Sequence, residues 1–379
     1  MSIYVVQPGD NVDGISFEYG VLPSVVIADN QLVYPYTLAV GQALFIRDGM
    51  TGGTGREIRS NGYAYPFISP WVLEQTLPYL TELSVFSYGF TAAGELIPPL
   101  LDDQWMINTA FRFRTRPILT LTPLGPDGKF DNALISVLVW NEERRLNLIN
   151  NILSIMAEKG YQGLDIDFEY IVAGDRDRFT EFVQICAEAM HRKGYTLSVA
   201  LAPKTSAGQR GLLYEGKDYQ AIGSAADHVL LMTYEWGYTY GPPMAVAPVN
   251  KVRQVVEYAV TEIPREKIGL GIPNYGYDWP LPFVQGETAA RTIGNIEAVR
   301  TAVSYGVPIQ FDPVAQAPYF YYRDGQGVRH EVWFEDVRSL QAKFDLVDDF
   351  SLRGPGYWQI MQLFRANWLL LEERFQIVK

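Results

Sequence analysis

The feature that most constrains the fold is a regular alternation of short apolar segments with longer amphipathic ones. It runs from about residue 60 to the C-terminus. The short apolar segments are 60–66, 83–90, 116–122, 161–169, 196–202, 228–234, 267–273 and 356–360. The segments between them show helical periodicity, including 141–158, 175–193, 250–261 and 335–343, and a further helix is expected at 361–375. Eight strand–helix units in succession predict an α/β fold, a closed TIM (β/α)8 barrel of parallel strands.

One stretch is longer than this barrel requires. Between the seventh and eighth expected strands, residues from about 280 to 330 include QFDPVAQAPYFYYRDGQGVRHEVWF, in which β-rich runs are separated by turn signals. This composition predicts a small α+β insertion on the rim of the barrel. We therefore assign residues 59–379 to one barrel domain with an insertion.

A short unit precedes the barrel. The segment GMTGGTGREI at 49–58 is rich in glycine and threonine, which is typical of a flexible linker, and it separates residues 1–48 from the rest. Within 1–48, a short β-strand at 3–6 and a turn with a strand at 41–46 flank two short helical segments. Asn11 is placed to cap the first helix and Gly20 to end it. The order predicts a βααβ module.

The module has a recognisable pattern. YVVQPGDNVDGIS, DNQ and LAVGQALFI, all within 3–47, resemble the LysM module, which binds N-acetylglucosamine polymers such as peptidoglycan and chitin. The resemblance implies glycan binding by the loops at 8–12 and 30–33, through backbone hydrogen bonds to acetamido groups. The candidate glycan-binding residues are Gly9, Asp10, Asn11, Asn30 and Gln31. The alternative is a module that only caps the fold and has no ligand.

The strongest indication of chemistry is the segment GLDIDFE at 163–169. Because side chains alternate along a strand, Asp165, Asp167 and Glu169 point together into the barrel, and Ile166 and Phe168 face the helices. Glu169 comes last, at the carboxyl end of the strand, where barrel enzymes carry out their chemistry. Carboxyls this close cannot all ionise easily, so some of their pKa values must rise. A carboxylic acid that stays protonated near neutral pH is a candidate general acid.

Together with Gln162, this segment resembles the DxxDxDxE signature of family 18 glycoside hydrolases. The resemblance implies hydrolysis, with retention, of β-1,4 bonds beside N-acetylglucosamine. The acetamido oxygen of the substrate then acts as the nucleophile. It further implies that Glu169 is the acid and later the base, that Asp167 orients the acetamido group, and that Asp165 tunes Asp167. The first Asp of the signature is Gln162 in this chain.

Other segments extend the resemblance. MTYE at 232–235 resembles the MxYD motif, which implies that Tyr234 binds the acetamido carbonyl and joins the catalytic set. GIPNYGY at 271–277 resembles the seventh-strand GxPxYG segment, and Trp358 matches the tryptophan that forms the floor of the −1 sugar site. The candidate substrate-binding residues are Trp358, Glu235, Tyr63, Tyr275, Asn274 and Gln162. Purely structural core roles for Tyr234 and Trp358 are the alternative.

Further motifs point to a subgroup of the family. LLMTYEWGYTYGPP, GIPNYGYDWPLP and WFEDVRSLQAKFDLVDDFSLRGPGYWQI, together with the leading module, resemble spore-associated glycosidases of endospore-forming bacteria. That group acts as N-acetylglucosaminidases on spore cortex peptidoglycan, which implies a role in germination. Hydrolysis of chitin oligosaccharides is one alternative, and an inactive glycan-binding barrel is another. The presence of Glu169 argues against the inactive barrel.

Composition excludes several classes of function. With 31 basic and 43 acidic residues, the net charge of −12 disfavours binding to nucleic acid or to an anionic membrane surface. The single cysteine allows no internal disulfide, the three histidines have no metal-like spacing, and we expect no metal or cofactor. The N-terminus resembles no signal peptide, and no apolar run is long enough for membrane insertion. We expect synthesis in the cytoplasm and association with the spore.

Overall fold

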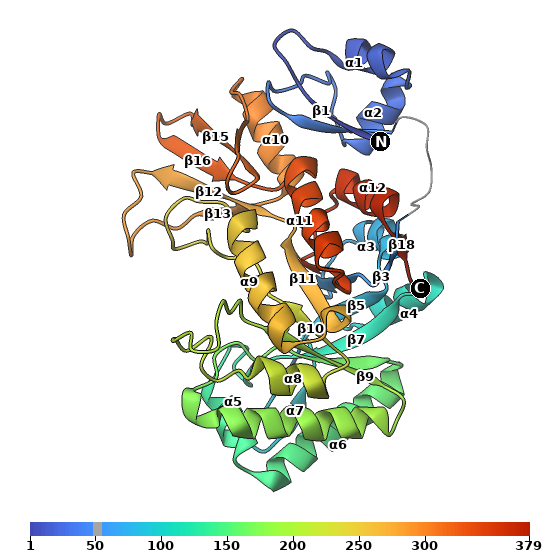
Figure 1. Cartoon of the computed structure of the whole chain (residues 1–379), viewed down its shortest axis with the longest axis vertical. Helices are drawn as coiled ribbons and strands as arrows, with labels where there is room; N and C mark the ends of the chain where they lie inside the picture. Colours follow the sequence, from blue (N-terminus) through green and yellow to red (C-terminus); the bar gives the residue numbers. More distant parts are fainter. Residues whose placement is uncertain (48–54) are drawn as a thin grey trace.

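The computed structural model describes residues 1–47 and 55–379, and its main part is a closed barrel of eight parallel strands (Figure 1). The barrel strands are β4 (Asn61–Ala64), β5 (Glu82–Phe90), β7 (Arg116–Leu121), β8 (Gly163–Ile166), β9 (Thr196–Leu201), β10 (His228–Leu231), β11 (Ile268–Pro273) and β17 (Gly354–Trp358). They follow the order β4-β17-β11-β10-β9-β8-β7-β5, and β4 also pairs with β5, which closes the sheet. All eight strands lie on the expected segments, so the predicted barrel is confirmed.

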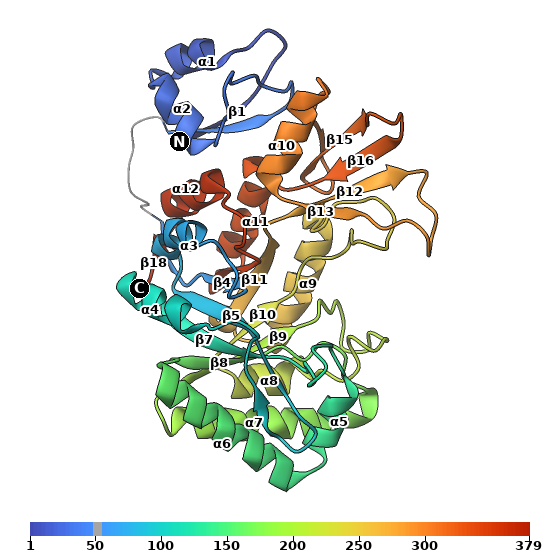
Figure 2. The same ribbon diagram turned by 180° about the vertical axis from the view of Figure 1, so that it is seen from behind.

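Helices cover the outside of the barrel (Figure 2). They are α3 (Pro70–Thr76), α4 (Gln104–Arg112), α5 (Ala133–Val139), α6 (Glu142–Lys159), α7 (Arg176–His191), α8 (Tyr219–Ala225), α9 (Val249–Glu262), α11 (Val337–Asp349) and α12 (Arg365–Arg374). The limits of α6 follow from local chemistry. The side chain of Asn141 accepts a hydrogen bond from Arg144 N at the start, and Gly160, with φ of 90°, ends the helix. The buried face of α6, which includes Ile152 and Met156, packs into the main core.

The expected insertion follows β11 and forms an antiparallel sheet beside the barrel (Figure 1). Its strands are β12 (Gly276–Leu281), β13 (Arg291–Ile293), β14 (Gln310–Asp312), β15 (Ala317–Arg323) and β16 (Arg329–Trp333), in the order β13-β12-β16-β15-β14. Helix α10 (Asn295–Ser304) packs on this sheet around the buried Phe320 and Val332. The insertion thus begins a few residues earlier than expected, because β12 follows β11 almost directly.

The N-terminal unit has the expected βααβ order. It consists of β1 (Ser2–Val5), α1 (Val12–Tyr19), α2 (Pro23–Asp29) and β2 (Ala43–Ile46), and the two strands pair antiparallel. Asn11 caps α1 by accepting a hydrogen bond from Gly14 N at 2.8 Å, and Gly20 ends the helix with φ of 65°. Both capping predictions are confirmed.

The module packs directly against the barrel domain, beside α10, α11 and α12 (Figures 1 and 2). Ile309 N donates to Val40 O at 2.8 Å, and the Arg338 guanidinium donates to Gly41 O at 3.1 Å. Arg365 N donates to Gln31 Oε1 at 2.7 Å. Of the expected linker at 49–58, residues 49–54 lie outside the described part. Its end, β3 (Glu57–Ile58), pairs with β18 (Gln376–Ile377) of the barrel domain.

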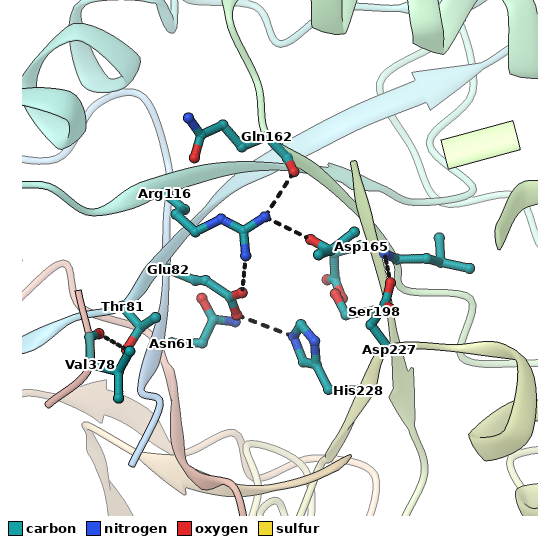
Figure 3. A network of polar contacts seen from close by, with 12 residues as sticks. Asn61, Thr81, Glu82, Arg116, Gln162, Asp165, Ser198, Asp227, His228 and Val378 are labelled. Carbon is teal, nitrogen blue, oxygen red and sulfur yellow. Dashed lines mark hydrogen bonds and ion pairs between the residues drawn. The ribbon is translucent and has the colours of Figure 1, made fainter. Parts of the chain in front are cut away.

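A charged network fills the amino-terminal end of the barrel (Figure 3). The buried Glu82 carboxylate lies 3.2 Å from His228 Nε2, 3.1 Å from Arg353 and 3.5 Å from Arg116. Burial would raise the pKa of Glu82, but the facing His228, Arg353 and Arg116 outweigh it and hold that pKa well below its usual range. The carboxylate is therefore ionised and paired, and it ties β5, β7, β10 and β17 together at the end opposite Glu169.

Candidate active site

The three acids of 163–169 lie along β8 and just beyond its carboxyl end. Asp165 is inside the barrel, where its carboxylate accepts hydrogen bonds from Tyr63 Oη at 2.9 Å and Ser198 Oγ at 2.6 Å. Asp167 is also buried, and its Oδ1 has no hydrogen-bond partner in the described part of the chain. Phe168 points the opposite way and stacks on Phe182 of α7, so the predicted alternation of faces is confirmed.

Burial sets the electrostatics of these acids. It is the largest cause of the raised pKa of Asp167, which the charges of Glu169 and Asp165 raise further. Burial also raises the pKa of Asp165, although the hydrogen bonds from Ser198 and Tyr63 oppose this. The expectation that some of these carboxyls would resist ionisation is confirmed for both aspartates.

The acids open into a cleft at the carboxyl end of the barrel. A cavity of about 660 Å³ contains Asp167 and Glu169 in its wall. A smaller cavity of about 140 Å³ adjoins it and shares Asp167, Glu169, Phe130 and Tyr170. Aromatic residues dominate the wall of the larger cavity: Tyr65, Phe86, Phe130, Tyr170, Tyr214, Tyr234, Trp236, Tyr238, Tyr277 and Trp358. Flat apolar rings with polar edges suit the faces of sugar rings, and Glu169 lies where the two cavities meet.

Tyr234, Glu235 and Trp358 line the cleft, and their contact with a substrate stays a prediction. The Glu235 carboxylate accepts hydrogen bonds from the hydroxyl groups of Tyr275 and Tyr277, the latter at 3.0 Å. Burial raises the pKa of Glu235, and these two hydrogen bonds act in the opposite direction. Glu235 is therefore held in place by two tyrosines from the insertion side of the cleft.

Three expected substrate-binding residues lie behind the cleft wall. Tyr63 is buried beneath Trp358, with 5.8 Å between ring centroids, and binds Asp165. Asn274 uses both N–H groups of its side chain to bind Gln359 O and Gln362 O. Tyr275 is buried and reaches the cleft only through Glu235. None of these three residues lines the cleft itself.

The expected substrate contact of Gln162 needs correction. Gln162 immediately precedes β8 at the amino end of the barrel, where its carbonyl accepts a hydrogen bond from Arg116 at 3.1 Å (Figure 3). The length of β8 separates it from Glu169, so Gln162 belongs to the network at the opposite end. The sequence motif placed it in one set with the acids because spacing alone does not show where a strand begins.

The predicted glycan-binding residues of the module have structural contacts. Asp10 accepts hydrogen bonds from Tyr4 Oη and Gln7 N, and Asn11 caps α1. Gly9 adopts φ of 91° in the turn just before Asp10. Asn30 uses both side-chain N–H groups on Val26 O and Phe45 O, so neither is free for a sugar. Gln31 faces the barrel domain through its bond from Arg365 N. Glycan binding by these residues stays a prediction.

Sequence reasoning missed two components of the site. Tyr65 lines the cleft two residues after Tyr63, and the period of two along a strand was the available signal. Lys217 is fully buried in the loop between β9 and α8, and the charges of Glu169 and Asp167 act on it. Burial lowers the pKa of Lys217 to about 8, although the two carboxylates favour its charged form. Nothing in the local sequence marks this lysine, because its partners lie about 50 residues earlier in the chain.

Metal sites and membrane-spanning helices are both absent from residues 1–47 and 55–379. No group of three or more His, Cys, Asp or Glu side chains there is placed to hold a metal ion. No helix in the same residues has the length and apolar character needed to cross a membrane.

Comparisons with known proteins agree with this geometry. The model of glycosyl hydrolases family 18 matches residues 124–362, and the LysM domain model matches residues 4–47. The cortical fragment-lytic enzymes of Bacillus subtilis and Bacillus cereus are each 38% identical to the chain, over 100% of it and 99% of their own lengths. The crystal structure of the Bacillus cereus spore cortex-lytic enzyme SleL is similar with a TM-score of 0.93 at 34% identity, and the match covers 100% of this chain and 99% of that one. The Bacillus megaterium SleL structure matches with a TM-score of 0.82 at 36% identity, over 100% and 87% of the two chains.

Proposed function

Because the chain belongs to glycosyl hydrolase family 18 and begins with a LysM domain, we propose that it hydrolyses β-1,4 bonds next to N-acetylglucosamine in spore cortex peptidoglycan. The observation that carries the proposal is the position of Glu169 between two cavities with an aromatic wall. A glycan can lie through both cavities, so that the bond to be cleaved passes Glu169, which is more exposed than the neighbouring Asp167. The cortex-lytic relatives, matched over the full chain, support cortex fragments as the substrate.

We further propose that the acetamido oxygen of the substrate is the nucleophile. The carboxyl residues in the wall of the larger cavity are Asp167, Glu169 and Glu235. Asp167 is buried with a raised pKa, and Glu235 is engaged by Tyr275 and Tyr277, so neither is free to form a glycosyl ester. Asp167 and Tyr234 flank the position of the acetamido group and hold it, while Glu169 protonates the leaving oxygen. Glu169 then takes a proton from the water that opens the oxazolinium intermediate, and the configuration is retained.

Replacement of the acid tests the activity. Glu169→Gln should keep the fold and lower kcat on soluble cortex fragments by about 10²–10⁴-fold, because general acid catalysis is worth that much. Release of reducing ends is the measurement, with chitin oligosaccharides as a second substrate. Glu188→Gln, on the exposed face of α7, is the matched control and should retain full activity. Residual turnover of Glu169→Gln above about a tenth of the wild type would exclude Glu169 as the acid, and faster cleavage of chitin than of cortex fragments would favour a chitinase.

The nucleophile is tested separately. A thiazoline that mimics the oxazolinium should inhibit far more tightly than the substrate binds, as transition-state-like ligands do. Mass spectrometry of the enzyme quenched during turnover should detect no glycosyl ester on a carboxylate. A trapped ester on Glu235 or Asp167 would contradict the substrate-assisted mechanism and leave the hydrolytic activity itself in place.

The LysM domain and the cortex-lytic relatives also support a location. We propose that the protein associates with the spore and that the module holds it on the peptidoglycan it cleaves.

A further inference from the structure

Lys217 is a buried cation with no direct partner. Its side chain is fully buried, and its Nζ makes no hydrogen bond in the described residues. The other fully buried lysine, Lys343, lies 2.8 Å from the Glu335 carboxylate and is paired. Burying an ammonium without a partner costs free energy of folding, and proteins accept such costs mainly at functional sites. The burial of Lys217 therefore calls for a functional explanation, whereas the burial of Lys343 is explained by its ion pair.

The backbone places Lys217 next to the loop that carries the acid. A Cβ at Gly216 would lie 2.3 Å from Ile171 O, so the 216–217 segment packs against the chain two residues beyond Glu169. Lys204 Nζ donates to Lys217 O at 3.1 Å and fixes the segment from the other side. Only glycine at 216 permits this approach, and it brings the lysine behind the acid-bearing loop.

The charges that act on Lys217 are the two carboxyls of the cleft. Glu169 and Asp167 both favour its ammonium form, and Lys217 in turn favours the ionised form of Asp167. Asp167 Oδ1, like Lys217 Nζ, is buried without a hydrogen-bond partner. Two unpaired ionic atoms of opposite sign in one low-dielectric region attract each other without direct contact.

We propose that Lys217 is a positioning residue for the hydrolysis, whose buried charge compensates the negative charge that gathers on Asp167 and Glu169 during the reaction. The inference rests on the proposed function and adds a component to the same site. In the first step the acetamido oxygen bonds to the anomeric carbon, the bond to the leaving oxygen breaks, and the Glu169 proton passes to that oxygen. Negative charge therefore develops on Glu169 while Asp167 stays negative beside it, and Lys217 is the nearby cation that compensates.

Neutral and charged replacements of Lys217 separate this role from a structural one. Lys217→Met should lower kcat on soluble cortex fragments by about tenfold or more and leave KM nearly unchanged. Both limbs of the pH profile of kcat should move to higher pH by about one unit, because loss of a nearby cation makes carboxyls harder to ionise. Lys217→Arg keeps the charge and should leave both limbs in place. The Tm of Lys217→Met should stay equal or rise, because the variant removes an unpaired buried charge.

Lys251→Met is the control, because Lys251 is exposed on α9 and lies outside the wall of the cleft. It should leave the limbs of the profile unmoved even if it lowers Tm. If the pH profile of kcat for Lys217→Met kept both limbs at their wild-type pH, the proposal would be overturned. Failure of both Lys217→Met and Lys217→Gln to fold would also overturn it, because it would show a structural role. The proposed hydrolysis would survive either result, because it is tested by Glu169→Gln.

Discussion

Asp167 is the residue at which the needs of stability and of catalysis are most clearly opposed. It is buried, one of its carboxylate oxygens has no partner, and burial is the main cause of its raised pKa. A carboxyl whose pKa is higher in the folded than in the unfolded chain takes up a proton on folding. Stability therefore falls as the pH rises from the ordinary value of about 4 towards the raised one. In the mechanism proposed above, the site needs an ionised group beside the reacting sugar, and this need accounts for the destabilised carboxyl.

Asp167→Asn should therefore stabilise the protein while it lowers kcat. At pH 7 we expect Tm to rise by about 2 °C or more. This gain should shrink as the pH falls towards 4 and vanish below it, where the wild-type carboxyl is protonated in both states. Thermal unfolding of both proteins across this pH range is the measurement. Asp177→Asn, on the exposed start of α7, is the control and should not raise Tm at pH 7. If the Tm of Asp167→Asn at pH 7 did not exceed that of the wild type, the conclusion that the buried Asp167 carboxyl destabilises the fold would be wrong.

Residue-scale prediction from the sequence succeeded where the signal was local. A period of two along one strand was enough to place Asp165 and Asp167 inside the barrel and Phe168 outside it. Lys217 was missed because its relation to the acids depends on how two separate loops pack. Gln162 was misplaced for the opposite reason, since a motif suggested a contact that the length of β8 forbids.

Among the elements, the docking of the module was the least predictable. The glycine-rich spacing at 49–58 indicated an independent tether, yet the module shares hydrogen bonds with the barrel domain, and Phe45 of β2 belongs to the main hydrophobic cluster. The eight strands and most helices were predictable because periodicity is a local property. The faces by which two domains meet are not periodic, and their contacts here join residues about 270 to 330 positions apart.

Gly41 is a point of very close approach between the module and the insertion. It adopts φ of 82°, and a Cβ there would lie 1.9 Å from Ile309 O, which is too close for any side chain. Gly41→Ala should loosen the docked module. The matched control is Gly20→Ala, which has φ of 65° and no atom near its added Cβ, so it suffers only the backbone strain of about 1 kcal/mol.

Hydrogen exchange tests this docking at one amide. Ile309 N donates to Val40 O across the interface, so its exchange should accelerate in Gly41→Ala and stay slow in Gly20→Ala. Tm should fall further in Gly41→Ala than in the control. Equal effects of the two variants would show that the interface does not depend on the close approach at Gly41.

At the scale of the whole molecule, the catalytic cleft and the module have separate surfaces. Every residue in the wall of the cleft lies at or beyond position 65, whereas the module contacts the side of the barrel near α10, α11 and α12. A cavity of about 350 Å³ lies at this junction, with apolar residues of both domains in its wall, including Val33 and Val299. The module thus covers apolar surface of the barrel domain without contributing to the cleft.

Removal of residues 1–54 should consequently lower the stability of the protein and its attachment to peptidoglycan, and leave the chemistry of the cleft unchanged. We expect Tm to fall, because the deletion exposes apolar surface that the module buries. At temperatures well below the new Tm, kcat on soluble cortex fragments should stay close to the full-length value, because the cleft keeps all its residues. Hydrolysis of insoluble peptidoglycan should weaken, because the two linked sites no longer raise each other's effective concentration.

Pull-down on insoluble peptidoglycan and release of reducing ends from both substrates are the measurements. An equal loss of kcat on soluble and insoluble substrates, in a variant that remains folded, would show that the docked module shapes the catalytic cleft.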